Sequence, residues 1–399
     1  MRLPTWESGL SGFRRYGGYQ ERILRSMRVC IVVPTLNPGR LWDAFSAALL
    51  ENLADLGLPA HSVLILDSAS NDGTLEKATA AGFRVHSISR DSFDHGGTRQ
   101  VAVALERGAE FLVYLTQDAV LAQPDAIRIL LKALENPAVG AAYGRQLPRP
   151  QARSVEVHAR LFNYPPVSRL RSFADRQSLG FKSIFASNSF CAYRRSALIS
   201  VGGFPQRAIC SEESIAIGRM HIEGWQSAYV AEATVYHSHG FTVAQEFQRY
   251  FDVGVTHARE PFMLEMFGTA NGEGKRFVIS EFRYLLEHEP SLIPSALLRT
   301  LTKLIGYRLG RKEAQLSLAM RRRLSMNGCF WRAECTARDQ RSARAPIQGA
   351  RADQWLASSA QRVTEMIPHP LQAKQELRRP AELATEVVRT SPVQQQRVR

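Results

Sequence analysis

Short apolar runs alternate with helical patterns through the first part of the chain. The runs predict buried strands, and the stretches between them carry apolar residues at helical spacing. The predicted strands cover residues 29–33, 63–66, 84–88, 111–115 and 139–143, and the predicted helices cover residues 41–56, 73–81, 98–107 and 126–134. Strand–helix alternation with short connections predicts an α/β fold with a mostly parallel central sheet that is covered on both faces.

The pattern changes after Gly144. Residues 145–180 are rich in Arg, Pro and Ser, which predicts a long loop with a short helix. Regular patterning then resumes, with an ordered segment at 181–197, a helix at 212–223, a strand at 228–230 and a helix at 243–258. We therefore divide the chain into an N-terminal extension (1–27), an α/β domain (28–260), a basic helical extension (261–335) and a poorly ordered tail (336–399).

The composition indicates in which cellular compartment the protein works and which class of partner it binds. The 399 residues carry a formal net charge of +14, which favours nucleic acid, anionic lipid or phosphorylated substrates. The five cysteines form no C-x-x-C pair, and no apolar run is long enough for a signal peptide or a membrane span, so we expect a cytoplasmic protein. The basic stretches lack interleaved aromatic residues, so we expect no nucleic acid, and a non-enzymatic nucleic-acid-binding protein is the weaker alternative.

Turn-prone residues gather where the predicted strands end, and open α/β sheets bind ligands at those ends. The first strand is followed by neither G-x-G-x-x-G nor G-x-x-x-x-G-K-[ST], which argues against Rossmann and P-loop sites. The candidates for ligand binding after the first two strands are Pro34, Thr35, Asn37, Asp67 and Ser70. Asp67 can accept a hydrogen bond from a base or a ribose, whereas Ser70 and Asp72 also suit a helix N-cap.

The third and fourth strand ends add a phosphate-binding pattern and an acid. Gly96 and Gly97 open a helix beside Arg99, and a helix N-terminus with an arginine suits a phosphate. Gln117 and Asp118 follow the buried run at 111–115. Asp118 can simply open a turn, but four successive polar strand ends favour one shared binding site.

Several motifs, in this order and spacing, resemble family 2 inverting glycosyltransferases of the bacterial rhamnosyltransferase branch. They lie at 32–37 (VVPTLN), 66–74 (LDSASNDGT), 93–99 (FDHGGTR), 115–119 (LTQDA), 187–188 (SN), 192–197 (AYRRSA), 235–239 (VYHSH), 245–252 (QEFQRYFD) and 307–311 (YRLGR). The resemblance covers roughly residues 28–331. It implies a GT-A type nucleotide-sugar-binding domain that transfers rhamnose from dTDP-L-rhamnose to a glycan acceptor, free or linked to a lipid diphosphate, in O-antigen-type polysaccharide synthesis. The candidates at the strand ends, including Arg99, Gln117 and Asp118, are then expected to bind the nucleotide-sugar donor. Another hexosyltransferase that uses a UDP-sugar is the alternative.

The resemblance also implies a metal site at Asp118. Similar enzymes place an Asp-x-Asp there to bind the ion that bridges the donor diphosphate, and this chain supplies only one carboxylate. Diphosphate oxygens and water complete the shell of a hard cation such as Mg²⁺ or Mn²⁺. His237 and His239 are two residues apart on a strand-like segment, so they point the same way and are candidate ligands, or else they are surface histidines.

The catalytic base is expected in the stretch CSEES at 210–214. Similar enzymes use the Asp of a Glu-Asp pair at the start of a helix, so Glu213 takes the position of the base and Glu212 precedes it. Glutamate lengthens the arm by one methylene relative to aspartate. The structural alternative is that both acids pair with the helix dipole after an N-cap at Ser211.

A basic amphipathic segment follows residue 290. Leu297, Leu301, Leu304 and Ile305 lie at helical spacing, and the basic residues beside them are Arg299, Lys303, Arg308, Arg311 and Lys312. Such a helix can lie on an anionic membrane surface, which would place the enzyme on the inner face of the plasma membrane. The alternative is that the same leucines pack against the catalytic domain.

Overall fold

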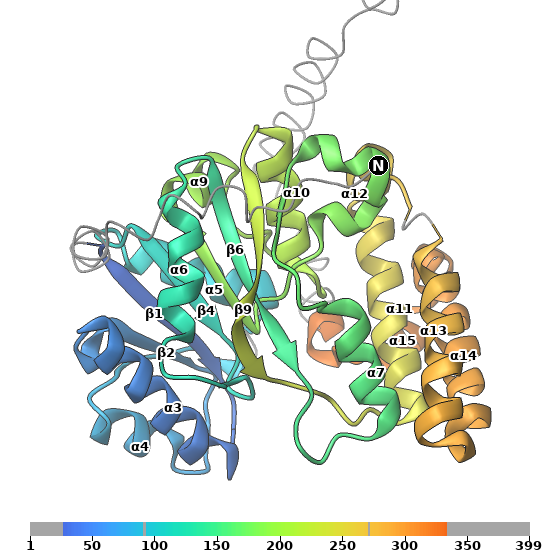
Figure 1. The fold of residues 1–399 in the computed structure, drawn as a ribbon, viewed down its shortest axis with the longest axis horizontal. Coiled ribbons are helices and arrows are strands. Elements are labelled where there is room, and N and C mark those ends of the chain that lie inside the picture. The colour runs from blue at the N-terminus through green and yellow to red at the C-terminus, as the bar shows by residue number, and fades with distance from the viewer. Residues whose placement is uncertain (1–26, 91–92, 270–271, 333–399) are drawn as a thin grey trace, which may run out of the picture. The chain divides into compact units, whose positions relative to one another are not determined.

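The computed structural model describes residues 27–90, 93–269 and 272–332. These residues belong to the first of two compact units, Met1–Gln340 and Arg341–Arg399. The expected N-terminal extension, apart from Met27, and the expected tail lie outside the described residues. The described part of the chain consists of a central sheet, the helices on its two faces, and further helices at one edge (Figure 1).

The strands of the described residues form one sheet in the order β3-β2-β1-β4-β8-β6-β9-β5, and β7 pairs with β9. The strands are β1 (Val29–Thr35), β2 (Val63–Asp67), β3 (Arg84–Ser87), β4 (Phe111–Leu115), β5 (Val120–Leu121), β6 (Val139–Leu147), β7 (Arg169–Arg171), β8 (Phe190–Arg194) and β9 (Gln226–Tyr236). The first four in chain order are parallel to one another, as the alternation predicts. The second half is mixed, because β8 enters antiparallel between β4 and β6.

The α-helices of the described residues are α3 (Leu41–Leu56), α4 (Thr74–Ala80), α5 (His95–Leu105), α6 (Ala126–Lys132), α7 (Ser154–Asn163), α8 (Arg176–Leu179), α9 (Arg195–Ser200), α10 (Glu212–Ile222), α11 (Val243–Arg259), α12 (Phe262–Phe267), α13 (Glu273–His288), α14 (Ile293–Arg311) and α15 (Leu318–Leu324). The six helices with predicted ranges, α3, α4, α5, α6, α10 and α11, lie close to them. Helix α5 begins earlier than predicted because Asp94 caps it, accepting a hydrogen bond from Gly97 N at 2.9 Å.

The strands are buried on both faces of the sheet. On β1, Ile31 and Val33 join the cluster that holds Trp42 and Phe45 of α3. Val32, between them, is equally buried, and α5 packs against β1 and β2. Burial on both faces explains why these strands are continuous apolar runs rather than alternating ones.

The structure corrects the expected long loop at 145–180. Strand β6 continues to Leu147, α7 packs on α13, and β7 pairs with β9. The short predicted strand at 228–230 is the middle of β9, an eleven-residue strand. Strand β9 has an irregular register with β6, which interrupts the regular alternation of apolar and polar residues along it.

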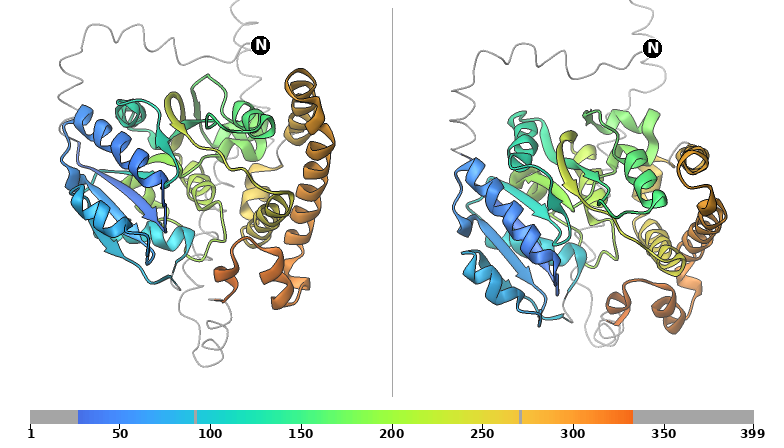
Figure 2. Two further views of the ribbon diagram at one scale, coloured as in Figure 1. Left: turned by 90° about the horizontal axis from the view of Figure 1, so that it is seen from below. Right: turned by 60° about the horizontal axis from the view of Figure 1, so that its bottom comes forward.

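Helices α13 and α14 lie at the outer edge of the described unit in every view, with α11 on their inner side (Figures 1 and 2). Helix α14 packs along α11 over much of its length. The helices after residue 260 therefore share their packing surface with helices of the α/β domain.

Candidate active site

Gln117 joins the ends of two neighbouring strands. Its Oε1 accepts a hydrogen bond from Leu36 N at 2.7 Å, and its Nε2 donates to Leu36 O at 3.0 Å. The side-chain amide thus extends the pairing of β1 with β4, whose register ends at Val32 and Tyr114. Gln117 was expected to bind the donor. In the structure its side chain instead ties the loop that carries Asp118 to the main chain of Leu36.

The predicted donor-binding residues after β1 and β2 form one hydrogen-bonded group. Asp67 accepts hydrogen bonds from Thr35 Oγ1 at 3.1 Å and from Ser70 N at 2.9 Å, and Ser70 Oγ accepts from Asn37 N at 2.9 Å. Pro34 lies beside this group on β1, paired in register with Leu66 of β2. Asp67 has no exposed surface, so in this conformation it holds the two loops together. The roles of these residues in donor binding stay predictions.

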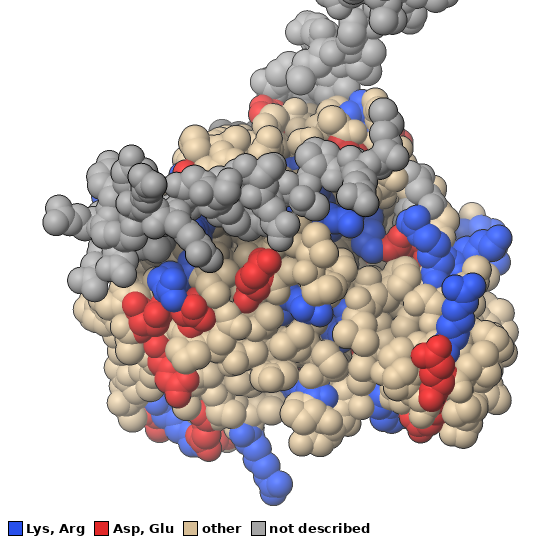
Figure 3. Space-filling view, in the orientation of Figure 1, with Lys and Arg blue, Asp and Glu red and all other residues tan. Residues whose placement is uncertain are grey.

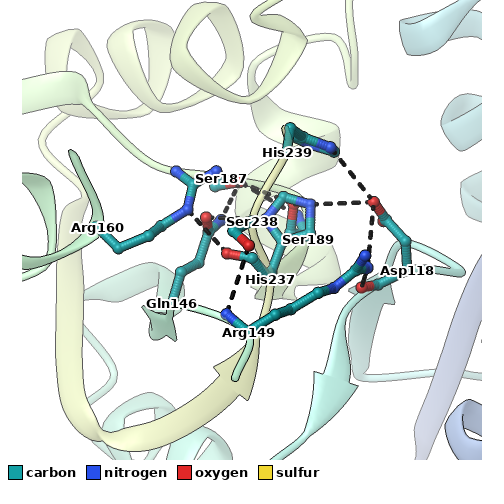
Figure 4. A network of polar contacts seen from close by, with 9 residues as sticks. All are labelled: Asp118, Gln146, Arg149, Arg160, Ser187, Ser189, His237, Ser238 and His239. Carbon is teal, nitrogen blue, oxygen red and sulfur yellow. Dashed lines mark hydrogen bonds and ion pairs between the residues drawn. The ribbon is translucent and has the colours of Figure 1, made fainter. Parts of the chain in front are cut away.

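Asp118, His237 and His239 converge at the ends of β4 and β9 (Figure 4). The short ladder between β5 and β9, in which Val120 pairs with Tyr236, brings the segments together. Asp118 Oδ2 lies 3.3 Å from His237 Nε2 and 3.7 Å from His239 Nδ1. One ligand atom from each residue lies within 4.8 Å of the others, which is the arrangement predicted for a metal site.

The protonation states of this Asp/His cluster suit a cation. Burial alone would raise the pKa of Asp118, but contact with His237 and the charge of His239 hold it well below its ordinary value. Burial lowers the pKa of both histidines. His237 Nδ1 lies 2.9 Å from Gln146 Oε1, and when Nδ1 carries the proton, the lone pair of Nε2 faces Asp118. An anionic oxygen and a ring nitrogen lone pair facing each other are the donor set of a metal site.

Glu212 is buried and held as a carboxylate. Its Oε1 lies 3.0 Å from Arg99 Nη1 and accepts a hydrogen bond from Asn188 Nδ2 at 2.9 Å. Burial would raise the pKa of Glu212, but Arg99, His95 and Asn188 together lower it. Arg99 was expected at the phosphate-binding end of α5, yet its side chain is only 6% exposed and faces Glu212 instead.

Glu213 follows on the first turn of α10 and stays partly accessible to solvent. Burial, and then the negative charge of Glu212, raise the pKa of Glu213 to about 8. Ser211 occupies the N-cap position with a left-handed φ of 62° and makes no capping hydrogen bond, so it does not cap the helix as the alternative supposed. Two adjacent acids with opposite pKa shifts are a typical arrangement of a general base beside a fixed charge.

The segment 187–189 connects the Asp/His cluster with Glu212 and Glu213, the acid pair. Ser187 Oγ accepts a hydrogen bond from Gln146 Nε2 at 2.9 Å, and Ser189 Oγ lies 3.5 Å from His237 Nε2. Between them, Asn188 donates to Glu212. One three-residue segment therefore contacts both groups, which places them in a single site.

Several site residues were missed by the sequence interpretation. Arg149 Nη2 donates to Asp118 O at 2.7 Å, and Arg160 Nε donates to His237 O at 2.8 Å (Figure 4). Arg249 is exposed on α11, and its charge acts on both Glu213 and His239. Arg149 and Arg160 lie in the segment predicted as a loop, where the excess of arginine was the available signal. Arg249 was visible only as part of the motif at 245–252.

Comparison with known proteins identifies the family. Residues 30–202 match the family described as Glycosyl transferase family 2. The O-antigen chain rhamnosyltransferase RfbN of Salmonella typhimurium (strain LT2) is 42% identical over 306 residues, which make up 76% of this chain and 96% of the relative. This chain belongs to glycosyltransferase family 2. The O-antigen chain rhamnosyltransferase WbaN of Salmonella anatum is 41% identical to this glycosyltransferase over 302 residues, 75% of this chain and 95% of the relative.

Solved structures also resemble this glycosyltransferase. The mannosyltransferase PcManGT from Pyrobaculum calidifontis, in complex with GDP-Man and Mn²⁺, has a TM-score of 0.45 and 18% identity, covering 86% of this chain and 92% of that chain. Family membership, together with the observed sheet, confirms the predicted GT-A type α/β domain. It also removes the alternative of a non-enzymatic nucleic-acid-binding protein.

Proposed function

We propose that this glycosyltransferase moves rhamnose from dTDP-L-rhamnose, with inversion, to a glycan carried on a lipid diphosphate during O-antigen-type polysaccharide synthesis. The names of the two Salmonella relatives support the sugar and the pathway class. The observation that carries the chemistry is the single site in which segment 187–189 joins the Asp/His cluster to the acid pair.

Asp118, His237 and His239 are the proposed metal ligands. One carboxylate and two imidazoles suit Mn²⁺ better than Mg²⁺, which prefers an all-oxygen shell with several waters. When bound, such an ion neutralises charge on the leaving diphosphate. Arg149 and Arg160 donate to the main chain of Asp118 and His237, and the charges of Arg160 and Arg249 act on His239, so all three add positive charge near the cluster.

Glu213 is the proposed general base. Its carboxylate takes the proton from the acceptor hydroxyl while that oxygen forms a bond to the anomeric carbon of rhamnose. The bond from that carbon to the diphosphate breaks on the opposite face, and the electron pair leaves with the dTDP oxygen, so the configuration inverts. Glu212 does not accept a proton, because Arg99 and Asn188 occupy its carboxylate and hold it ionised.

Arg99 is reassigned from the donor phosphates to positioning Glu212. The partners of Gln117 and Asp67 support the same kind of role for these two residues, as supports of the loops around the donor rather than direct contacts.

Titration against a panel of nucleotide sugars tests the donor. We expect dTDP-L-rhamnose to bind at least about tenfold more tightly than UDP-glucose or UDP-N-acetylglucosamine, because a site selects its donor through several polar contacts. Tighter binding of a UDP-sugar would establish the alternative hexosyltransferase. Binding of none of them by the folded protein would remove the proposed function.

Removal of the metal tests the Asp/His cluster. We expect Asp118→Asn to lower kcat by about two orders of magnitude or more, and chelation to abolish activity that Mn²⁺ then restores. His239→Gln serves as the graded variant, with weaker Mn²⁺ affinity and a smaller loss of kcat. Full activity in excess chelator would instead assign the charge neutralisation to the surrounding arginines.

The pH profile tests the base. A carboxyl group with a raised pKa is mostly protonated below that pKa, so kcat/KM should rise with pH and level off above about 8. Glu213→Gln should abolish this rise of kcat/KM with pH and lower kcat by about 10²–10⁴. Glu212→Gln removes a neighbouring negative charge, which lowers the pKa of Glu213 and moves the rise to lower pH. If Glu212→Gln abolishes turnover and Glu213→Gln does not, the base is Glu212.

We also propose that the outer face of α13 and α14 rests on an anionic membrane. Apolar side chains on this face are between 42% and 55% exposed, namely Ile279, Phe282, Leu286, Leu297, Leu298, Leu301, Leu304 and Ile305. These four leucines of α14 therefore do not pack against the catalytic domain, whereas Leu309 packs on the cluster around Phe251 and Val255. No helix among the described residues has the length and apolar character to cross a membrane, so this face is a candidate for the interfacial zone.

The structure corrects the charges expected beside this face. Arg299 is buried and pairs with Glu246 Oε1 at 2.7 Å, and Lys303 pairs with Glu246 Oε2 at 3.2 Å, so both point inward. Arg308, Arg311 and Lys312 remain exposed near the end of α14. Figure 3 shows Lys and Arg, together with some Asp and Glu, among uncharged surface at the edge where α13 and α14 lie. At about 1 kcal/mol for each basic residue, electrostatics assists a contact that the apolar side chains provide.

A further inference from the structure

A large apolar cavity lies apart from the Asp/His cluster and the acid pair. Its volume is about 790 Å³, and residues of α7, α11, α13 and α14 line it. Side chains that form its apolar walls include Phe162, Phe185, Val253, Phe277, Val278 and Leu304. Sites for organic ligands typically enclose about 300–1,000 Å³ and are mostly apolar, so both size and lining fit a ligand.

The outer end of the cavity reaches the exposed face of α13 and α14. Val278, Ile279 and Thr300 line both the cavity and a smaller groove of about 220 Å³ between these two helices. Ile279 and Leu304 belong to the exposed apolar face itself. The lining of the cavity is therefore continuous with that apolar face.

Three separate segments carry both residues that line the cavity and residues that contact or act on the active site. On α11, Tyr250 lines the cavity and the preceding Arg249 acts electrostatically on Glu213. Phe185 lines the cavity two residues before segment 187–189, which contacts both parts of the site. The third segment is 162–164, in which Phe162 lines the cavity and Tyr164 is coupled electrostatically to Glu213.

We propose that this cavity holds the apolar chain of the lipid that carries the acceptor glycan. The inference rests on the proposed function, because it needs a lipid-linked acceptor whose hydroxyl reaches Glu213. The chain enters from the membrane-facing helices, and its phosphate lies toward Arg249, between the cavity and the base. Among the lysines that line the cavity, Lys275 is exposed and can attract an anionic head group, whereas the charges of Lys182 and Lys303 are already paired with Glu273 and Glu246.

Two phosphates that differ only in their chains test the proposal. Farnesyl phosphate and isopentenyl phosphate share a head group, so we expect the longer chain to bind the full-length protein at least about tenfold more tightly in detergent-free titration. Val278→Trp fills the cavity from α13 and should remove the difference. Leu301→Trp is the matched control, because Leu301 is 53% exposed on α14 and outside the cavity lining, and it should keep the difference.

Each other outcome contradicts the proposal. Equal binding of the two phosphates by the wild-type protein, or an equal loss in Val278→Trp and Leu301→Trp, would show that the cavity does not take the chain. A dimer that dissociates only in Val278→Trp would identify a second copy of this chain as the occupant. Val253→Phe fills the same cavity from α11 and replaces Val278→Trp if that variant does not fold. Titration of dTDP-L-rhamnose on the same samples separates a failure of this inference from a failure of the proposed function.

Discussion

Helices α3 and α14 have similar lengths, 16 and 19 residues, and both carry regularly spaced apolar residues. Helix α3 buries the face with its large apolar side chains, whereas α14 buries a face of small residues and one arginine. Helix α3 buries its large side chains, Trp42, Phe45, Leu49, Leu53 and Leu56. The buried residues of α14 are Ala296, Arg299, Gly306 and Gly310, while Leu297, Leu298, Leu301 and Leu304 face outward. An amphipathic pattern therefore identifies the apolar face of a helix without showing that this face is buried.

The two helices are held by different interactions. Helix α3 is held by apolar burial against the sheet. Helix α14 approaches α11 so closely that a Cβ on Gly310 would lie 2.0 Å from Phe251 O, and one on Gly306 would lie 2.5 Å from Phe247 O. Arg299 adds a buried pair with Glu246 of α11. Close backbone contact thus fixes α14 and leaves its outward-facing leucines available for a membrane.

Truncation of a large side chain on each helix gives the largest expected contrast. Phe45→Ala should cost about 3–5 kcal/mol of unfolding free energy, because it leaves a cavity in the main core. Leu301→Ala should change it by less than about 0.5 kcal/mol, because that side chain is already exposed. Chemical denaturation of both variants measures the difference. Similar losses would mean that the outer face of α14 is packed in solution.

Loss of the buried charge of Arg299 on α14 should have the next largest effect on stability. Arg299→Met leaves Glu246 with only Lys303 as a partner and should cost about 3 kcal/mol. The double variant Arg299→Met/Glu246→Met removes both charges and should recover most of this loss. Thermal melts of the single and double variants test the pair. A double variant as unstable as the single one would show that packing of Arg299, rather than its charge, holds α14.

A methyl group between α11 and α14 should have an intermediate effect. Gly310→Ala places Cβ against the backbone of Phe251, and we expect a loss of about 1–3 kcal/mol despite the better helix propensity of alanine. Gly274→Ala is the matched helical control, since its Cβ would meet nothing within 4 Å, and its melting temperature should stay level or rise slightly. Equal behaviour of the two variants would rule out a tight backbone contact.

Polar residues on the outer face should have the smallest effect on stability. Leu297→Gln/Leu301→Gln should leave the unfolding free energy within about 0.5 kcal/mol of wild type and reduce sedimentation with phosphatidylglycerol vesicles by about tenfold. Ile199→Gln changes an equally exposed residue on α9 and should bind vesicles normally. A wild-type protein that stays in the supernatant at low salt would remove the membrane proposal.

The candidate site was only partly predictable. The motifs identified Asp118, His237, His239, Glu212 and Glu213, and the structure brings the first three together as expected. Their closeness depends on the short ladder between β5 and β9, and β5 is too short for the apolar pattern to reveal. The motifs also placed Gln117 and Arg99 near the site. Whether each contacts a ligand or supports a neighbouring residue depends on which side chains it faces, and the motifs do not show this.

The sequence by itself determined the family, the succession of strands and helices along the first half of the chain, and the apolar face of the helix after residue 290. These properties follow from local periodicity and from motifs at short range. Only the tertiary structure decided that Arg99 pairs with Glu212, that segment 187–189 joins the two parts of the site, and that four leucines of α14 face outward. Each of these depends on contacts between segments that lie far apart in the chain. The apolar pattern of α14, for example, carries no information about the glycine and the charge that α11 places against it.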